Sequence, residues 1–127
     1  MKAVRSYRDL DVWQQSMALV EECYKVTRAL PAEERFGLSA QVRRAAASIP
    51  SNLAEGHCRR STAAYLNPVS IALGSQAELE TELELARRLG FVRGETFDSL
   101  DRALRQVGRQ LYGLHRALDL RLRADRK

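Results

Sequence analysis

Four carboxylates stand close together in the stretch ELETELE: Glu78, Glu80, Glu82 and Glu84. A metal site in a helical protein typically uses such glutamates together with a histidine three residues after one of them. Neither His57 nor His115 has a glutamate at that spacing. The helical period also divides the glutamates into two pairs, 78/82 and 80/84, that point well apart. We therefore expect them to form ion pairs, with Arg87 and Arg88 as candidate partners, and we expect no metal.

Other catalytic signatures are missing from the sequence. It contains no glycine-rich phosphate loop, no dinucleotide-binding fingerprint and no paired-cysteine metal motif. A serine nucleophile would need a positioned base, which no residue pattern supplies. Cys23 falls on an apolar stripe, as a core residue would, and Cys58 falls near a helix end, where exposure is expected. We therefore expect no enzyme activity, no catalytic residues and no cofactor.

Basic side chains gather near the end of the chain. Residues 102–127 carry a net charge of +6, although the whole chain carries only +5. Four of these residues share one heptad position opposite a leucine seam, and a fifth lies nearby: Arg102, Arg109, Arg116 and Arg123, with Arg105. Such a row, with a repeat of about 10.5 Å, could contact successive phosphates of a nucleic acid. The alternative is an ordinary solvated helix face.

Apolar residues recur at spacings of three and four along most of the chain, which predicts long helices. The predicted helices run from Asp9 or Asp11 to Leu30, from Leu38 to about Arg59, from Thr62 to Leu89, and from Thr96 onward. The last has a regular seam of Phe97, Leu100, Leu104, Val107, Leu111, Leu114 and Leu118. Short connections between four such helices predict an all-α, antiparallel, up-down-up-down four-helix bundle.

This bundle should form a single domain over residues 1–127, because the chain is too short for two independent cores. No segment has the length and apolarity of a membrane span or a secretory signal, so we expect a cytoplasmic protein. Two prolines, Pro50 and Pro68, fall inside predicted helices, where each removes a backbone donor. We expect the second helix to be kinked at Pro50, with Asn52 and Glu55 spaced as a capping pair that could restart it.

The second predicted helix separates into three faces at 100° per residue. The core face holds Leu38, Val42, Ala45, Ala46, Ile49 and Leu53. A polar seam beside it holds Gln41, Arg44, Ser48, Asn52 and Glu55, together with Arg59. The third face, expected to point outward, holds Ala40, Arg43, Ala47, Pro50 and Ala54.

Two of these faces suggest contacts. Small residues on an outward face, where long charged side chains are usual, favour an oligomer interface, although alanine also serves simply as a good helix former. The polar seam is interpreted as a hydrogen-bonded contact between helices or subunits, with Arg44 pairing to Glu78 or Glu82. The alternative for this seam is a binding groove.

Several segments of the chain resemble one known family. They are RDLDVWQQ, FGLSAQVRRAAASIPSNLAEG and GSQAELE, and the likeness extends over nearly the whole chain. In these segments the chain is similar to the 23S ribosomal RNA intervening-sequence proteins. One departure is Leu66-Asn67-Pro68, where the family usually continues with apolar or aromatic residues; either the third helix kinks there or Asn67 caps a fresh start.

The resemblance implies a small bacterial protein with a left-handed bundle that assembles as a homopentamer, as related accessory proteins of diversity-generating retroelements do. Those relatives associate with reverse transcriptase and nucleic acid, and no catalytic residues carry over. The sequence thus favours a non-catalytic homo-oligomer that binds RNA or a ribonucleoprotein. The alternative is a protein-protein adaptor or scaffold with no nucleic-acid binding; neither hypothesis involves a membrane or a small-molecule substrate.

Overall fold

The computed structural model describes residues 4–126 and shows an all-α protein, with helices and no strand in this part of the chain. Two short 3-10 turns accompany the four helices. In chain order the elements are η1 (Tyr7–Asp9), α1 (Asp11–Arg28), η2 (Ala32–Glu34), α2 (Leu38–His57), α3 (Thr62–Arg88) and α4 (Gly94–Asp125). The four long helices begin and end within a few residues of the predicted bounds.

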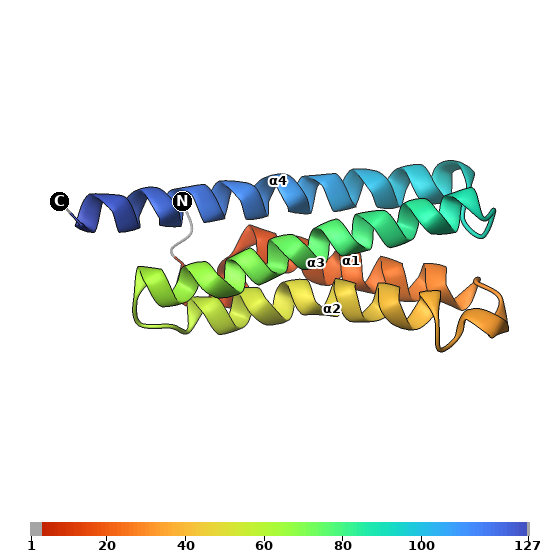
Figure 1. Ribbon diagram of the computed structural model, residues 1–127, viewed down its shortest axis with the longest axis horizontal. Coiled ribbons are helices and arrows are strands. Elements are labelled where there is room, and N and C mark those ends of the chain that lie inside the picture. Colours follow the sequence, from red (N-terminus) through yellow and green to blue (C-terminus); the bar gives the residue numbers. More distant parts are fainter. Residues whose placement is uncertain (1–3, 127) are drawn as a thin grey trace.

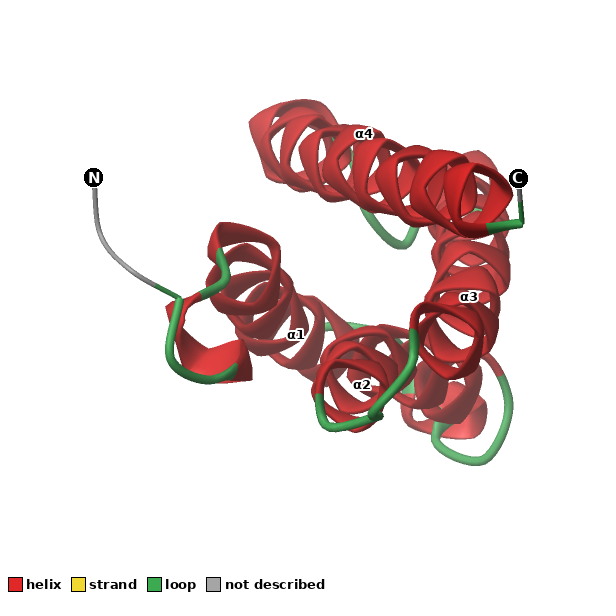
Figure 2. Cartoon of the chain, turned by 90° about the vertical axis from the view of Figure 1, so that its left-hand side faces the viewer, coloured by secondary structure: helices red, strands yellow, loops and turns green. Residues whose placement is uncertain are grey.

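The four helices lie lengthwise beside one another, and the connections between them fall at alternating ends of the molecule (Figure 1). Helices that follow one another in the chain contact one another, and α4 also contacts α1, though less extensively. Viewed from its end, the molecule is an arc in which α2 and α3 occupy the middle and α1 and α4 the two tips (Figure 2). The handedness of the arrangement stays a prediction.

Local sequence explains where the helices begin and end. Ser61 caps α3, because its side-chain oxygen accepts a hydrogen bond from the Ala64 backbone N–H at 3.1 Å. Gly90 and Gly94 have φ values of +80° and +62°, which side chains disfavour, and they reverse the chain between α3 and α4. These glycines therefore allow a short connection between two long helices.

The core forms along the predicted apolar seams. In α4 the buried residues are Leu100, Leu104, Val107, Leu111 and Leu118. Phe97 and Leu114 of the same seam pack against the core while remaining partly exposed. All six predicted core residues of α2 are buried as well. The periodicity of the apolar residues thus identified the inward sides of α2 and α4 correctly.

Neither internal proline interrupts its helix. Both α2 and α3 are continuous, and Pro50 and Pro68 are buried within them. The prediction that α2 restarts at Asn52 is therefore wrong. The side-chain amide of Asn52 donates a hydrogen bond at 2.8 Å to the Ser48 carbonyl, inside the same helix. The fresh start of α3 at Asn67 is also wrong, because Ser61 supplies the cap further upstream. A bend at Pro50 stays a prediction.

The ends of α2 and α3 approach each other closely at Gly56. A Cβ added there would lie 2.7 Å from Cδ1 of Tyr65 and 3.2 Å from Cβ of Pro68. Real Cβ atoms do not come this close to a ring carbon, so the contact requires glycine. Gly56 thereby fixes how tightly the first turns of α3 pack on α2.

Candidate interaction surfaces

The arginine row lies on α4, and all five of its members are exposed. Ion pairs with nearby acids occupy three of them. Arg102 contacts Glu95 at 2.7 Å, Arg105 contacts Asp101 at 2.9 Å, and Arg123 contacts Asp119 at 3.2 Å. These carboxylates raise the pKa of Arg102 and Arg105, since each guanidinium donates hydrogen bonds to its partner. The acids on α4 therefore reduce the charge that these arginines offer to a partner.

The other two arginines of the row keep their charge available. Arg109 and Arg116 form no ion pair among residues 4–126 and are exposed. Tyr112, between them in sequence, exposes 65% of its surface. Tyr112 was absent from the sequence-based prediction, although an outward tyrosine among arginines is typical of a surface that stacks on bases.

The two ends of α4 differ in charge. Residues 94–104 carry a net charge of −2, whereas residues 105–126 carry +4. The basic end also extends beyond the other helices (Figure 1). The C-terminal part of α4 is thus basic overall, and the unpaired arginines of the row, Arg109 and Arg116, lie within it.

The predicted outward face of α2 is partly covered by the chain itself. The Arg43 Nε donates a hydrogen bond to the Thr27 hydroxyl at 2.8 Å, and its guanidinium stacks over the Tyr24 ring at 4.6 Å. Both partners belong to α1. The outward orientation expected for Arg43 is therefore wrong, because this residue connects α2 to α1.

The other members of that face are also partly enclosed. Pro50 is buried, and Ala40, Ala47 and Ala54 are half-buried. Both α1 and η1 contact α2. The outward position expected for Pro50 is thus wrong within a single chain. The hypothesis of an oligomer interface on these residues stays a prediction, with less exposed surface than the sequence suggested.

The polar seam of α2 turns toward α3. The hydroxyl groups of Ser48 and Ser75 are hydrogen bonded at 2.8 Å, and the Asn52 amide donates to the Ser48 hydroxyl at 3.0 Å. Ser75 was not part of the sequence-based prediction, because a serine within a helix does not reveal which neighbouring helix it meets. At the exposed end of the seam Glu55 pairs with Arg59.

At the other end of the seam, Gln41 and Arg44 line a groove of about 640 Å³ between α2 and α3. Arg44 makes no ion pair with Glu78 or Glu82 within 4 Å. The pKa of Glu82 is raised, mainly by burial and also by the Glu78 charge. The Arg44 charge opposes this rise. One oxygen of Glu82, Oε1, is enclosed and lacks a hydrogen-bond partner among the described residues. This groove therefore holds a carboxylate that the chain leaves incompletely paired.

The remaining glutamates of ELETELE form ion pairs. Glu84 accepts hydrogen bonds from both Arg87 and Arg88, which lower its pKa to about 2. Glu80 lies 3.9 Å from Arg105 of α4. The expected pairing with Arg87 and Arg88 is confirmed for Glu84.

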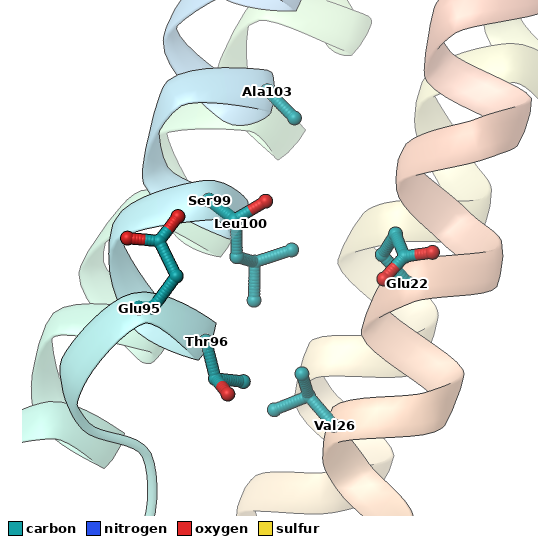
Figure 3. A pocket seen from close by; sticks show the side chains of 7 residues that line it. All are labelled: Glu22, Val26, Glu95, Thr96, Ser99, Leu100 and Ala103. Atoms are coloured by element: carbon teal, nitrogen blue, oxygen red, sulfur yellow. The ribbon is translucent and has the colours of Figure 1, made fainter.

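A second groove, of about 320 Å³, lies between α1 and α4. Val26 of α1 and Leu100 of α4 extend into the space between the helices, with Glu22 and Glu95 at its margins (Figure 3). Both glutamates already have partners, since Glu22 pairs with Lys25 and Glu95 with Arg102. Apolar side chains thus line the base of the groove, and the two glutamates at its margins are already paired with basic residues of the same chain.

Within residues 4–126, no group of three or more His, Cys, Asp or Glu residues could hold a metal ion. Cys23 is fully buried, and burial raises its pKa to about 12, so it remains a protonated thiol at neutral pH. Cys58 is exposed. Both cysteines have the burial that the sequence predicted.

None of the helices in the described part of the chain has both the length and the apolar character needed to cross a bilayer.

The four long helices and the motifs of α1 to α3 define the class of this protein as a small all-α protein of four helices. A family model described as 23S rRNA-intervening sequence protein matches residues 8–113. The chain therefore belongs to the family of 23S rRNA-intervening sequence proteins. The matched region ends inside α4 and includes the first part of its basic end, with Arg105 and Arg109.

A solved structure supports the same assignment. It is a protein of unknown function from the S23 ribosomal protein family of Bacteroides thetaiotaomicron. The two chains share 26% sequence identity and a TM-score of 0.76, over 82% of this chain and 97% of the other. A search among curated proteins found no significant match.

Proposed function

We propose that this protein is a non-catalytic, cytoplasmic homo-oligomer that binds RNA or a ribonucleoprotein through the basic end of α4. In this proposal the helices form a left-handed antiparallel bundle, and the pentamer implied by the family resemblance is the assembly. The observation that best supports this proposal concerns Arg109 and Arg116. Both are exposed, and neither forms an ion pair among the described residues.

The physical case rests on charge and repetition. A helix that presents guanidinium groups about 10.5 Å apart can neutralise phosphates without reading base sequence. A single such row gives weak binding, but several copies in one assembly act together and raise the overall affinity. Oligomerisation and nucleic-acid binding therefore support each other in this proposal.

A salt titration with a structured RNA tests the proposal. Affinity should fall steeply as salt rises, because phosphate contacts release bound counterions. Replacing Arg102, Arg109 and Arg116 together by alanine should weaken binding without changing the mass of the assembly. Undetectable binding of structured RNA at low salt would contradict the RNA part of the proposal.

The second candidate function is a protein-protein adaptor whose arginines mainly keep it soluble. The ion pairs of Arg102, Arg105 and Arg123 with acids on α4 favour it, since paired arginines are poor phosphate ligands. The adaptor would bind RNA no more strongly than any protein of similar charge, and its affinity for RNA would not depend on Arg109 and Arg116.

A further inference from the structure

The outward face of α3 combines exposed apolar side chains and small residues with a single exposed carboxylate, Glu78. Its exposed residues include Ile71, Gly74, Ala77, Glu78, Thr81 and Leu85, which we call the α3 outward face. Ile71 and Leu85 expose 48% and 47% of their surface. Outward helix positions in a monomer normally carry polar residues, so apolar side chains spaced along one helix indicate a surface that another chain covers.

Gly74 supports this reading independently. Glycine inside a helix lowers helix stability relative to alanine, so its presence calls for a reason. Gly56 has one, because Tyr65 and Pro68 crowd it, but a Cβ on Gly74 would meet no atom within 4 Å. Gly113 of α4 is equally open, but Arg109 and Arg116 beside it are exposed and charged, so its surroundings do not suit an apolar contact. Close approach of a second helix would account for glycine at position 74.

The α3 outward face is also hollowed. The groove of about 640 Å³ between α2 and α3 and a third groove, of about 530 Å³, both include Ala77, Thr81 and Leu85 in their linings. The third groove is also lined by Glu80, Glu84 and Arg88. Side chains of a partner could enter on either side of the small residues. This shape suits interdigitating side chains.

The charges at this face indicate what kind of partner fits. Glu78, Glu82 and Arg44 line the same groove and leave one net negative charge. Glu78 is exposed and forms no ion pair among the described residues, so its carboxylate could accept a guanidinium from a partner. A nucleic acid would be repelled here. A copy of this chain offers exposed arginines and a net charge of +5.

We propose that the α3 outward face is the surface on which a second copy of this chain packs. Ile71 and Leu85 become buried at the contact, Gly74 allows the helices to approach, and an arginine of the partner subunit pairs with the Glu78 and Glu82 carboxylates. This inference rests on the self-association part of the proposed function and names the surface that performs it, in place of the partly covered face of α2.

The test is sedimentation equilibrium of Leu85→Glu at micromolar concentration. A carboxylate at the centre of an apolar contact should raise the dissociation constant of the assembly by about 100-fold or more. The variant should therefore sediment near the chain mass of 14.4 kDa. The matched control is Leu120→Glu on α4, where an equally exposed leucine lies outside the proposed contact; it should assemble like the wild type.

A second variant, Ala77→Arg, guards against misfolding of the first, and circular dichroism should show unchanged helicity for all three. If the Leu85→Glu and Ala77→Arg variants both assemble as the wild type does, this inference is overturned and the proposed assembly stands. A wild-type chain that is monomeric at micromolar concentration would overturn both. An assembly lost equally in Leu120→Glu would overturn the assignment to α3.

Discussion

The outward faces of α3 and α4 are chemically opposite, although both helices pack their inward sides into the same core. The α3 outward face has exposed Ile71 and Leu85 around small residues, whereas α4 presents exposed arginines and Tyr112. Core packing cannot explain this difference, because neither outward face takes part in it. In our proposal these two outward surfaces meet different partners: a second copy of this chain at α3 and a polyanion at α4.

The largest expected effect concerns the packing that orients α3. Gly56→Ala should lower the free energy of unfolding by about 1–3 kcal/mol, because the added methyl group overlaps the Tyr65 ring and the close contact must open. Chemical denaturation monitored by circular dichroism measures this. An unchanged or higher stability would mean that α3 can shift away from α2 without cost, and that the orientation of its outward face is not fixed.

Next in size is the loss of RNA affinity when the free arginines of α4 are removed. Arg109→Ala combined with Arg116→Ala should lower affinity at low salt by about tenfold or more, since two phosphate contacts are lost. The matched control is Arg102→Ala combined with Arg105→Ala, whose members already pair with Glu95 and Asp101. Filter binding with a structured RNA should show a smaller loss for the control. Equal losses would show that the ion pairs do not distinguish the two ends of α4.

Gly74→Ala should have a smaller effect whose sign depends on assembly. In dilute, dissociated protein it should raise the free energy of unfolding by up to about 1 kcal/mol, because alanine favours the helix and the space around the new methyl group is open. The same change should weaken association. Stabilisation with unaltered association would show that no helix approaches Gly74.

The smallest expected effect is that of Glu82→Gln. Burial raises the pKa of Glu82 in the folded protein, so stability from this group declines as pH rises through that pKa and is lowest at neutral pH. The amide should therefore stabilise the dissociated chain at pH 7 by less than about 1 kcal/mol. It should also weaken association, if a guanidinium of another subunit pairs with the carboxylate. Denaturation curves at pH 5 and pH 7, with sedimentation of the same samples, separate the two effects.

Sequence reasoning located the helices well because each leaves a strong local signal. The seam of α4 is periodic throughout, and Pro31 and Gly90 lie just beyond the ends of α1 at Arg28 and α3 at Arg88. The same reasoning also identified which side of α2 meets the core. These features depend on residues a few positions apart, which the sequence displays directly.

The sides of α2 could not be assigned in the same way, because α2 has helical neighbours on two flanks, α1 and α3. Arg43 looked outward on a helical wheel, yet it reaches Thr27 and Tyr24 of α1. Conversely, the exposed position of Leu85 depends on where α2 and α4 lie around α3. Such facts follow from tertiary packing and leave no periodic signal in the sequence.

Hydroxyl-radical footprinting of the wild-type protein tests the central claim, that the two outward faces meet different partners. At a concentration where the protein is assembled, Ile71 and Leu85 should be protected relative to a dilute sample, while Tyr112 and Leu120 remain reactive. Adding structured RNA should then protect Tyr112 and leave Leu120 and the α3 outward face unchanged. Ile71 and Leu85 as reactive as Leu120 in the assembled protein would contradict the account.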